Sequence, residues 1–99
     1  IMPAPQPFTT PNYAYFPVIF DGFRRSRDEV QALLAEHEIF TRKYFYPLTN
    51  DYACYRDYPT AGKEKTPVAA HIADRVLTLP MYADLDADDI DRICDLILC

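Results

Sequence analysis

Cysteine, glycine and long apolar runs are all scarce in this sequence, and each scarcity argues against one class of protein. The three cysteines, Cys54, Cys94 and Cys99, are odd in number and form no C-x-x-C pair, so they indicate neither a disulfide framework nor a zinc knuckle. A reducing, cytoplasmic location is therefore expected. With two glycines, the chain has no glycine-rich phosphate turn. Its longest apolar runs fall far short of the roughly 20 residues that cross a membrane, so no membrane partner is expected.

Positive charge is scarce too. The chain carries 10 Lys and Arg against 15 Asp and Glu, which gives a formal net charge of -5 and a pI near 4.8. Because proteins that bind the nucleic-acid backbone present clustered basic side chains to its phosphates, nucleic acid is not an expected partner. The sequence also has no Ser/His/Asp elbow and no metal-ligand spacing, so neither a hydrolase nor a metal site is predicted.

The sequence does contain enough material for one small domain. Its 99 residues are 49% hydrophobic and 25% charged, which is typical of a globular protein. Residues 1–12 include four prolines and are predicted to form an extended lead-in. Residues 13–99 are predicted to form a single domain. A start at Ile1 without a signal-peptide pattern is expected of a piece of a longer protein.

Strands and helices are expected to alternate along the domain. Strands are predicted at residues 13–20, 40–46 and 76–79, and helices at residues 26–37, 66–75 and 86–98. Ser26 and Glu29 have the spacing of a capping box. Pro17 lacks an N–H group, so the first strand is expected at an edge or at a bulge. The predicted fold class is α+β, a two-layer domain with a three-stranded, mostly antiparallel sheet and helices packed on one face.

The segment Arg42–Leu48 is the best candidate for a binding surface, because it combines three aromatic residues with two cations. In a strand, Arg42, Tyr44 and Tyr46 would share one face. A guanidinium group beside phenol rings suits a flat polar ligand. The alternative is that the tyrosines are half buried against the core. The polar and aromatic stretch at residues 49–65 is predicted to be a long loop with a functional or covering role.

Several segments in series resemble the C-terminal small domain of the DegT/DnrJ/StrS family. Members of this family are pyridoxal-phosphate-dependent sugar aminotransferases of fold type I. The resemblance covers nearly the whole chain after the proline-rich lead-in, and its segments are residues 13–20, 42–48, 67–82 and 86–98. The strand that ends in Leu-Pro-Met-Tyr, before a helix with an acidic cap, is the most distinctive. The Tyr-Phe-Tyr-Pro run is most similar to the branch that acts on nucleotide-linked 3-keto or 4-keto 6-deoxyhexoses, typically dTDP sugars.

This resemblance implies that the full-length protein transfers an amino group, usually from glutamate, to a keto sugar with pyridoxal phosphate as cofactor. The family's catalytic lysine belongs to a Ser-x-x-Lys motif in a large domain, and the lysines here, Lys43, Lys63 and Lys65, lie in no such motif. No catalytic residue and no cofactor contact is therefore expected within this segment. The resemblance also implies three partners, which are an N-terminal large domain, a second subunit in a homodimer, and the nucleotide sugar.

Substrate contacts are implied by the same resemblance, since family members often carry histidines where Tyr44 and Thr49 stand here. Arg42, Tyr44 and Tyr46 are expected to face the active-site cleft, with Arg42 holding the diphosphate or a sugar hydroxyl, and Tyr82 is expected to join them. Packing between domains is an equal alternative for Tyr46 and Tyr82. Two other classes stay open: a stand-alone α+β domain that binds a small molecule, and a protein-interaction module with exposed aromatics.

Overall fold

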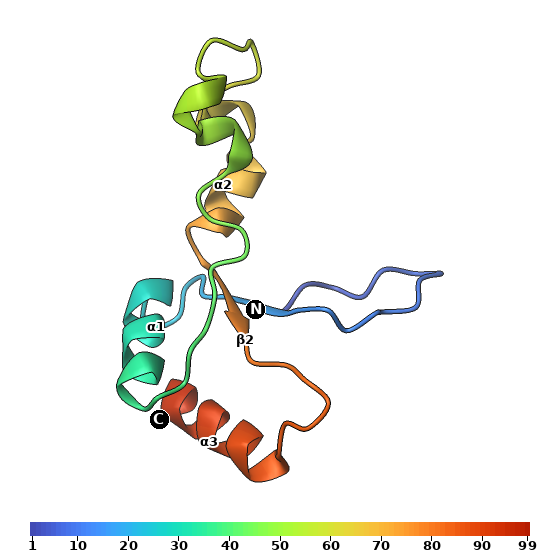
Figure 1. Ribbon diagram of the computed structural model, residues 1–99, viewed down its shortest axis with the longest axis vertical. Coiled ribbons are helices and arrows are strands. Elements are labelled where there is room, and N and C mark those ends of the chain that lie inside the picture. The colour runs from blue at the N-terminus through green and yellow to red at the C-terminus, as the bar shows by residue number, and fades with distance from the viewer.

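The computed structural model describes residues 1–99 as two short strands, three helices and three 3-10 turns (Figure 1). In chain order these are β1 (Phe16–Ile19), α1 (Arg27–Glu36), η1 (Thr49–Asp51), η2 (Ala53–Tyr55), η3 (Lys63–Lys65), α2 (Pro67–Ala73), β2 (Val76–Leu79) and α3 (Ala87–Leu98). Residues 1–15 contain no helix or strand. No helix is long and apolar enough to cross a membrane.

The sheet has two strands, β1 and β2, which pair antiparallel with Phe16 opposite Leu79. The predicted third strand, at residues 40–46, is reduced to a single bridge in which Arg42 and Thr78 exchange both backbone hydrogen bonds, at 3.2 and 2.7 Å. The reason is a turn directly after that bridge, closed by the Tyr46 N–H group, which donates to the Lys43 carbonyl at 2.8 Å. The α+β class is confirmed, and the prediction of three strands was wrong.

Pro17 lies in β1 at a position where its missing N–H group removes no hydrogen bond between β1 and β2. It lies opposite Thr78, whose backbone N–H and C=O both point away from β1 toward Arg42. In an antiparallel ladder, opposite residues alternate between bonded and non-bonded pairs, and Pro17 occupies a non-bonded position. The edge position predicted for this strand therefore explains how the sheet accepts a proline.

Helix α1 begins as the sequence predicts, with the Ser26 hydroxyl accepting from the Glu29 N–H group and the Glu29 carboxylate accepting from the Ser26 N–H group. The Ser26 N–H group and hydroxyl both donate to the Glu29 carboxylate, and these two hydrogen bonds lower the pKa of Glu29. The helix turns Val30 and Leu34 fully into the core. Its apolar stripe thus fixes how α1 lies on the sheet.

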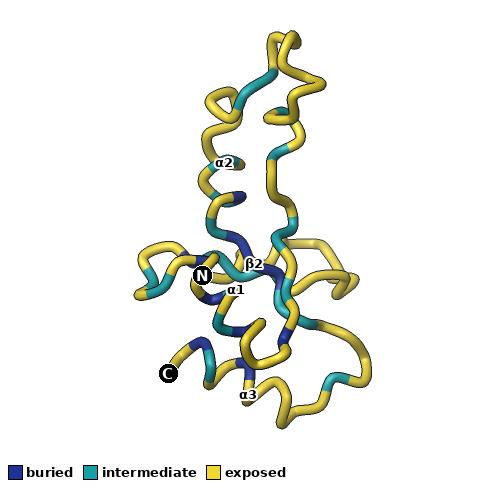
Figure 2. Tube along the Cα trace, turned by 60° about the vertical axis from the view of Figure 1, so that its left-hand side comes forward, coloured by how far each residue is buried: buried dark blue, intermediate teal, exposed yellow.

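The core lies between the sheet and the two helices α1 and α3 (Figure 2). Its buried members are Phe20, Val30, Leu34, Ile39, Leu77, Ile93 and Ile97. Helix α2 does not join this layer and extends away from it (Figure 1). The expected packing of helices on one face therefore holds for α1 and α3 but not for α2.

Residues 44–75, called the arm below, project from the end of the sheet (Figure 1). The predicted long loop at residues 49–65 forms most of the arm and contains the three 3-10 turns. Asn50 holds the loop closed, since its amide group donates to the carbonyls of Thr60 and Gly62 and to the Thr66 hydroxyl. Most of the arm is exposed (Figure 2). Its shape depends on local hydrogen bonds rather than on a core.

The chain exposes far more surface than a compact domain of its mass. Its accessible area is 7582 Å², whereas a folded monomer of 11.5 kDa exposes about 5,800 Å². The radius of gyration is 15.6 Å, against about 12.6 Å for a compact chain of this length. Only 11 of the 99 residues are buried, and many large apolar side chains stay exposed. This surface is sufficient for a further interface.

Candidate functional site

Arg42 stands at the rim of a hollow of about 280 Å³ beside the sheet. The bridge to Thr78 fixes its backbone, and Tyr44 lines the same hollow. The guanidinium carbon of Arg42 lies 6.0 Å from the centroid of the Tyr44 ring. The structure therefore brings together two of the four predicted site residues.

Three aromatic rings form one cluster next to Arg42. The Tyr15 ring meets the Tyr44 ring edge-on with centroids 5.2 Å apart, and it meets the Phe45 ring edge-on at 6.1 Å. Tyr44 and Phe45 are stacked at 5.0 Å. Tyr15 and Phe45 both remain more than half exposed, at 53% and 67%. The cluster thus offers ring surface to a ligand or to another protein surface.

Tyr15 was not among the predicted site residues. No local signal in the sequence marks Tyr15: it directly precedes β1, whose first residue Phe16 pairs with Leu79 in the structure. Arg42 bridges to Thr78, the residue before Leu79, on the edge of β2 opposite to β1. Only the pairing of distant segments places Tyr15 beside Tyr44, and the sequence does not give that pairing.

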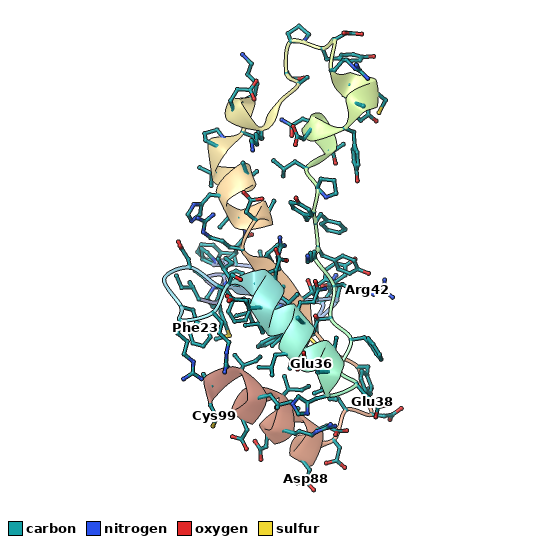
Figure 3. The ribbon with its side chains drawn as sticks, turned by 90° about the vertical axis from the view of Figure 1, so that its left-hand side faces the viewer. Phe23, Glu36, Glu38, Arg42, Asp88 and Cys99 are labelled. Carbon is teal, nitrogen blue, oxygen red and sulfur yellow. The ribbon has the colours of Figure 1, made fainter.

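Arg42 differs from every other arginine in the chain, because its side chain makes no hydrogen bond and no ion pair. The others have partners: Arg24 donates to the Ile97 carbonyl, Arg25 to Leu96, Arg27 to Ala73, Arg56 to Ala53 and Arg92 to His37, and Arg75 pairs with Asp21. Figure 3 shows Arg42 extending outward from the chain. Its positive charge is therefore free to meet an anion.

Tyr46 does not share the hollow of Arg42 and Tyr44. The turn after Lys43 breaks the strand alternation on which the shared face was predicted, so that part of the prediction was wrong. Instead the Tyr46 ring faces the guanidinium carbon of Arg27 at 5.0 Å. It lines a separate small hollow of about 60 Å³ at the base of the arm, with Lys63 among the other residues.

Tyr82 lies in the loop between β2 and α3, and it too is apart from Arg42. It lines a hollow of about 340 Å³ together with Arg92 and Glu38. Phe40 and Pro80 border both this hollow and the one at Arg42, so the two are neighbours. The structure does not place Tyr82 in the hollow of Arg42.

Arg27 joins the arm to the core, and the sequence did not reveal this role. Its side chain is only 4% exposed. One terminal nitrogen donates to the carbonyls of Ala73 and Val76, at 3.1 and 3.3 Å. Its Nε atom lies 2.7 Å from the Asp28 carboxylate, as an ion pair not aligned for a hydrogen bond. The local sequence shows only a charged helix start.

Two acidic residues near the arm base have lowered pKa values. Lys43 donates to Asp28 and lowers its pKa, with the charge of Arg27 acting in the same direction. His71 lies 2.8 Å from a carboxylate oxygen of Asp21, and this hydrogen bond lowers the Asp21 pKa, with Arg75 acting in the same direction. His71 is exposed. The Asp21 cluster ties the arm to the segment between β1 and α1, and the Asp28 cluster ties Lys43, directly before the arm, to α1.

The remaining reactive groups do not converge on a catalytic centre. The three cysteines are free and exposed, and no group of three His, Cys, Asp or Glu side chains could hold a metal ion. Lys43 is paired with Asp28, whereas Lys63 and Lys65 lie exposed on the η3 turn of the arm. None of these lysines is enclosed as a lysine that carries a cofactor would be.

Comparisons with known proteins by family model and by sequence both match aminotransferases. The family model for the DegT/DnrJ/EryC1/StrS aminotransferase family matches residues 2–98. An Escherichia coli dTDP-4-amino-4,6-dideoxy-D-glucose transaminase is 43% identical over 91 residues, and one from Shigella dysenteriae is 39% identical over 83 residues. These alignments cover 91% and 83% of this chain but only 24% and 22% of the relatives.

A structural comparison agrees with this at the level of the fold. A solved protein from Bacillus cereus ATCC 10987, named as a PLP-dependent aminotransferase, matches with a TM-score of 0.70 at 20% identity. The match covers 86% of this chain and 22% of that protein. The chain therefore spans about a quarter of the length of the proteins that it matches.

Proposed function

The chain belongs to the DegT/DnrJ/EryC1/StrS aminotransferase family, and we propose on that premise that it is one segment of a nucleotide-sugar aminotransferase. The full-length enzyme would transfer an amino group from glutamate to a dTDP-linked keto-6-deoxyhexose. The names of the two curated relatives support a dTDP-linked amino sugar as the product class.

The observation that carries this proposal is the unpaired guanidinium of Arg42 at the rim of an aromatic hollow. A sugar nucleotide presents phosphates, which arginine binds through two parallel hydrogen bonds. We assign Arg42 and Tyr44 to direct substrate contact. Tyr46 and Tyr82 line neighbouring hollows, and we propose that they border the substrate in the complete active site.

Pyridoxal phosphate, by this proposal, is held by the part of the protein outside this segment, and it supplies the amino-transfer chemistry there. The pairing of Lys43 with Asp28 and the exposure of Lys63 and Lys65 support this division. The proposed role of the segment itself is to bind and orient the sugar nucleotide. It would be a substrate-facing part of the enzyme without a catalytic residue.

The partners we propose are an N-terminal large domain and a second subunit of a homodimer. The chain exposes about 1,800 Å² more surface than a compact monomer of its mass, and a stable interface of standard size needs about 800 Å² from each partner. Exposed aromatic residues of the arm, such as Tyr52 and Tyr58, are suited to such contacts. The exposed free cysteines support a reducing, cytoplasmic location.

The test is steady-state kinetics of the full-length enzyme carrying Arg42→Ala. We expect the KM for the sugar nucleotide to rise about ten- to a hundredfold, since a hydrogen bond to a charged group contributes about 1.5–3 kcal/mol. The glutamate half-reaction should keep its rate. Arg56→Ala is the matched control, because Arg56 donates only to the Ala53 carbonyl within its own turn. An unchanged KM in Arg42→Ala would remove Arg42 from the substrate site.

A protein-interaction module without enzymatic activity is the second candidate, and the exposed aromatic arm favours it. The two functions differ in one simple property of the full-length protein. An aminotransferase carries a visible chromophore that glutamate changes, whereas an interaction module carries none. Absorption spectra of the protein purified from its source cells decide between them.

A further inference from the structure

We infer that residues 1–15, called the anchor loop below, dock in an apolar recess on the part of the polypeptide outside this segment, with Phe8 as the side chain that enters the recess. This inference rests on the proposed function, in which a large domain lies outside the segment. It names the surface of this chain that contacts that domain, the residue that anchors the contact, and the chemistry of the surface that receives it.

The anchor loop differs in composition from the rest of the chain. No charged side chain occurs before Asp21, although charged residues make up 25% of the sequence. All of residues 1–15 are exposed, and they include large apolar side chains at Ile1, Met2, Phe8, Tyr13 and Tyr15. Depletion of charge together with enrichment of aromatic residues and Met is typical of the core of a protein interface. The anchor loop therefore has the composition of a surface that another surface covers.

Both ends of the anchor loop are held on the sheet. Ile1 and Ile19 exchange both backbone hydrogen bonds, each at 2.8 Å, and the other end of the loop continues directly into β1. Between these two ends the chain runs outward from the sheet and returns to it (Figure 1). Because its ends are fixed, the loop loses less conformational entropy when it docks, and this favours affinity.

The turn of the anchor loop holds Phe8 in a conformation that a bulky residue rarely adopts. Residues 7–8 form this turn, and the Thr9 hydroxyl donates across it to the Gln6 carbonyl at 2.8 Å. Phe8 has a φ of 61°, in the region where turns normally place Gly or Asn, and it is fully exposed. Strained residues persist where the surrounding structure enforces them, and they concentrate at binding sites. Because no part of the segment covers Phe8, we place the enforcing surroundings outside the segment.

The rest of the same polypeptide is the occupant that the observations favour. This segment covers only 24% and 22% of the two curated relatives, and a surface on the same chain meets the loop at a high effective concentration. A second copy of the segment fits less well, because it carries a net charge of -5 and its carboxylates would lose water against an uncharged loop. A lipid surface also fits less well, because segments that bind membranes combine apolar residues with Lys or Arg, and the loop has neither cation.

The test is hydrogen exchange of the full-length enzyme, measured by mass spectrometry on peptides from residues 1–15. We expect these amides to exchange at least about tenfold more slowly than their intrinsic rates, because docking covers them. Phe8→Gly should remove most of this protection, although glycine relieves the strain of a positive φ. Phe8→Leu keeps an apolar side chain and should lose less protection than Phe8→Gly. Val68→Ala is the matched control, because Val68 is an exposed apolar residue of the arm, and unchanged exchange along α1 shows that the core of each variant is folded.

The outcomes separate this inference from the proposed function. Exchange at intrinsic rates in the wild-type loop, or equal protection in Phe8→Gly and wild type, overturns the inference even where the enzyme is an active aminotransferase. Protection that is lost when the protein is diluted to monomers assigns the loop to a second copy, and protection that appears only with phosphatidylglycerol vesicles assigns it to a lipid surface. Either result also overturns the inference. Absence of the cofactor chromophore and of transamination in the wild type refutes the proposed function, and the exchange of the loop then still decides whether the rest of the polypeptide covers it.

Discussion

The core and the arm of this protein are stabilised in opposite ways. The core buries Val30, Leu34 and Leu77 completely between the sheet and two helices. The arm, residues 44–75, has a single buried residue, Ala73, and depends on local hydrogen bonds such as those of Asn50. Apolar burial contributes more to stability than exposed hydrogen bonds do. The core is therefore expected to be the stable half and the arm the half that a partner completes.

The candidate site lies where these two regions meet. Arg42 belongs to the sheet through its bridge to Thr78, whereas Tyr44 and Phe45 begin the arm. A region of low local stability beside a rigid one is a common setting for binding segments.

Removing a core side chain should give the largest effect. Leu34→Ala leaves a cavity at a fully buried position and is expected to lower the free energy of unfolding of the 99-residue chain by about 3 kcal/mol. Urea unfolding followed by tyrosine fluorescence measures this change. Val68→Ala is the matched control in the arm, because Val68 is exposed, and it should change stability by less than about 0.5 kcal/mol. Equal losses in the two variants would contradict the division into core and arm.

Arg27→Ala should loosen the arm while leaving most of the core intact. The change removes donors from the carbonyls of Ala73 and Val76, and unpaired buried acceptors cost about 1–3 kcal/mol. We expect faster hydrogen exchange along α2, measured by mass spectrometry, with little change in α1. Arg24→Ala is the control, since Arg24 is exposed and makes one long bond. A uniform loss of protection across α1 and α2 would show that Arg27 stabilises the core as well as the arm.

Signals within a few residues of one another predicted the parts that the structure confirms. The Ser26 and Glu29 pair fixed the start of α1, and the Asp86 cap fixed the start of α3. Features that depend on distant segments were missed. The strand expected at residues 40–46 ends at Arg42, since residues 44–45 turn into the arm. Propensity alone favoured a strand there, and tertiary context decided otherwise.

The candidate site was predictable only in part for the same reason. Arg42 and Tyr44 are close in sequence and share a hollow, whereas Tyr15 reaches them through the pairing of β1 with β2. Arg27 is buried because the end of α2 packs over it. A local charge pattern cannot distinguish such a residue from a solvated one.

Lowering the pH should affect the arm through Asp21, and this is the smallest effect we predict. The folded-state pKa of Asp21 lies below its ordinary value of 3.8 because of its contacts with His71 and Arg75. The stabilisation is therefore fully present above pH 3.8 and is lost as the pH falls through the lower folded-state value. Because Asp21 and His71 are exposed and Arg75 is only half-buried, solvent screening keeps the effect small. The protection of α2 amides against hydrogen exchange, expressed relative to the intrinsic exchange rate at each pH, should fall more between pH 6 and pH 3 in the wild type than in Asp21→Asn, which has already lost the charge. An equal fall in both proteins would mean that the Asp21 carboxylate does not carry the acid sensitivity of the arm.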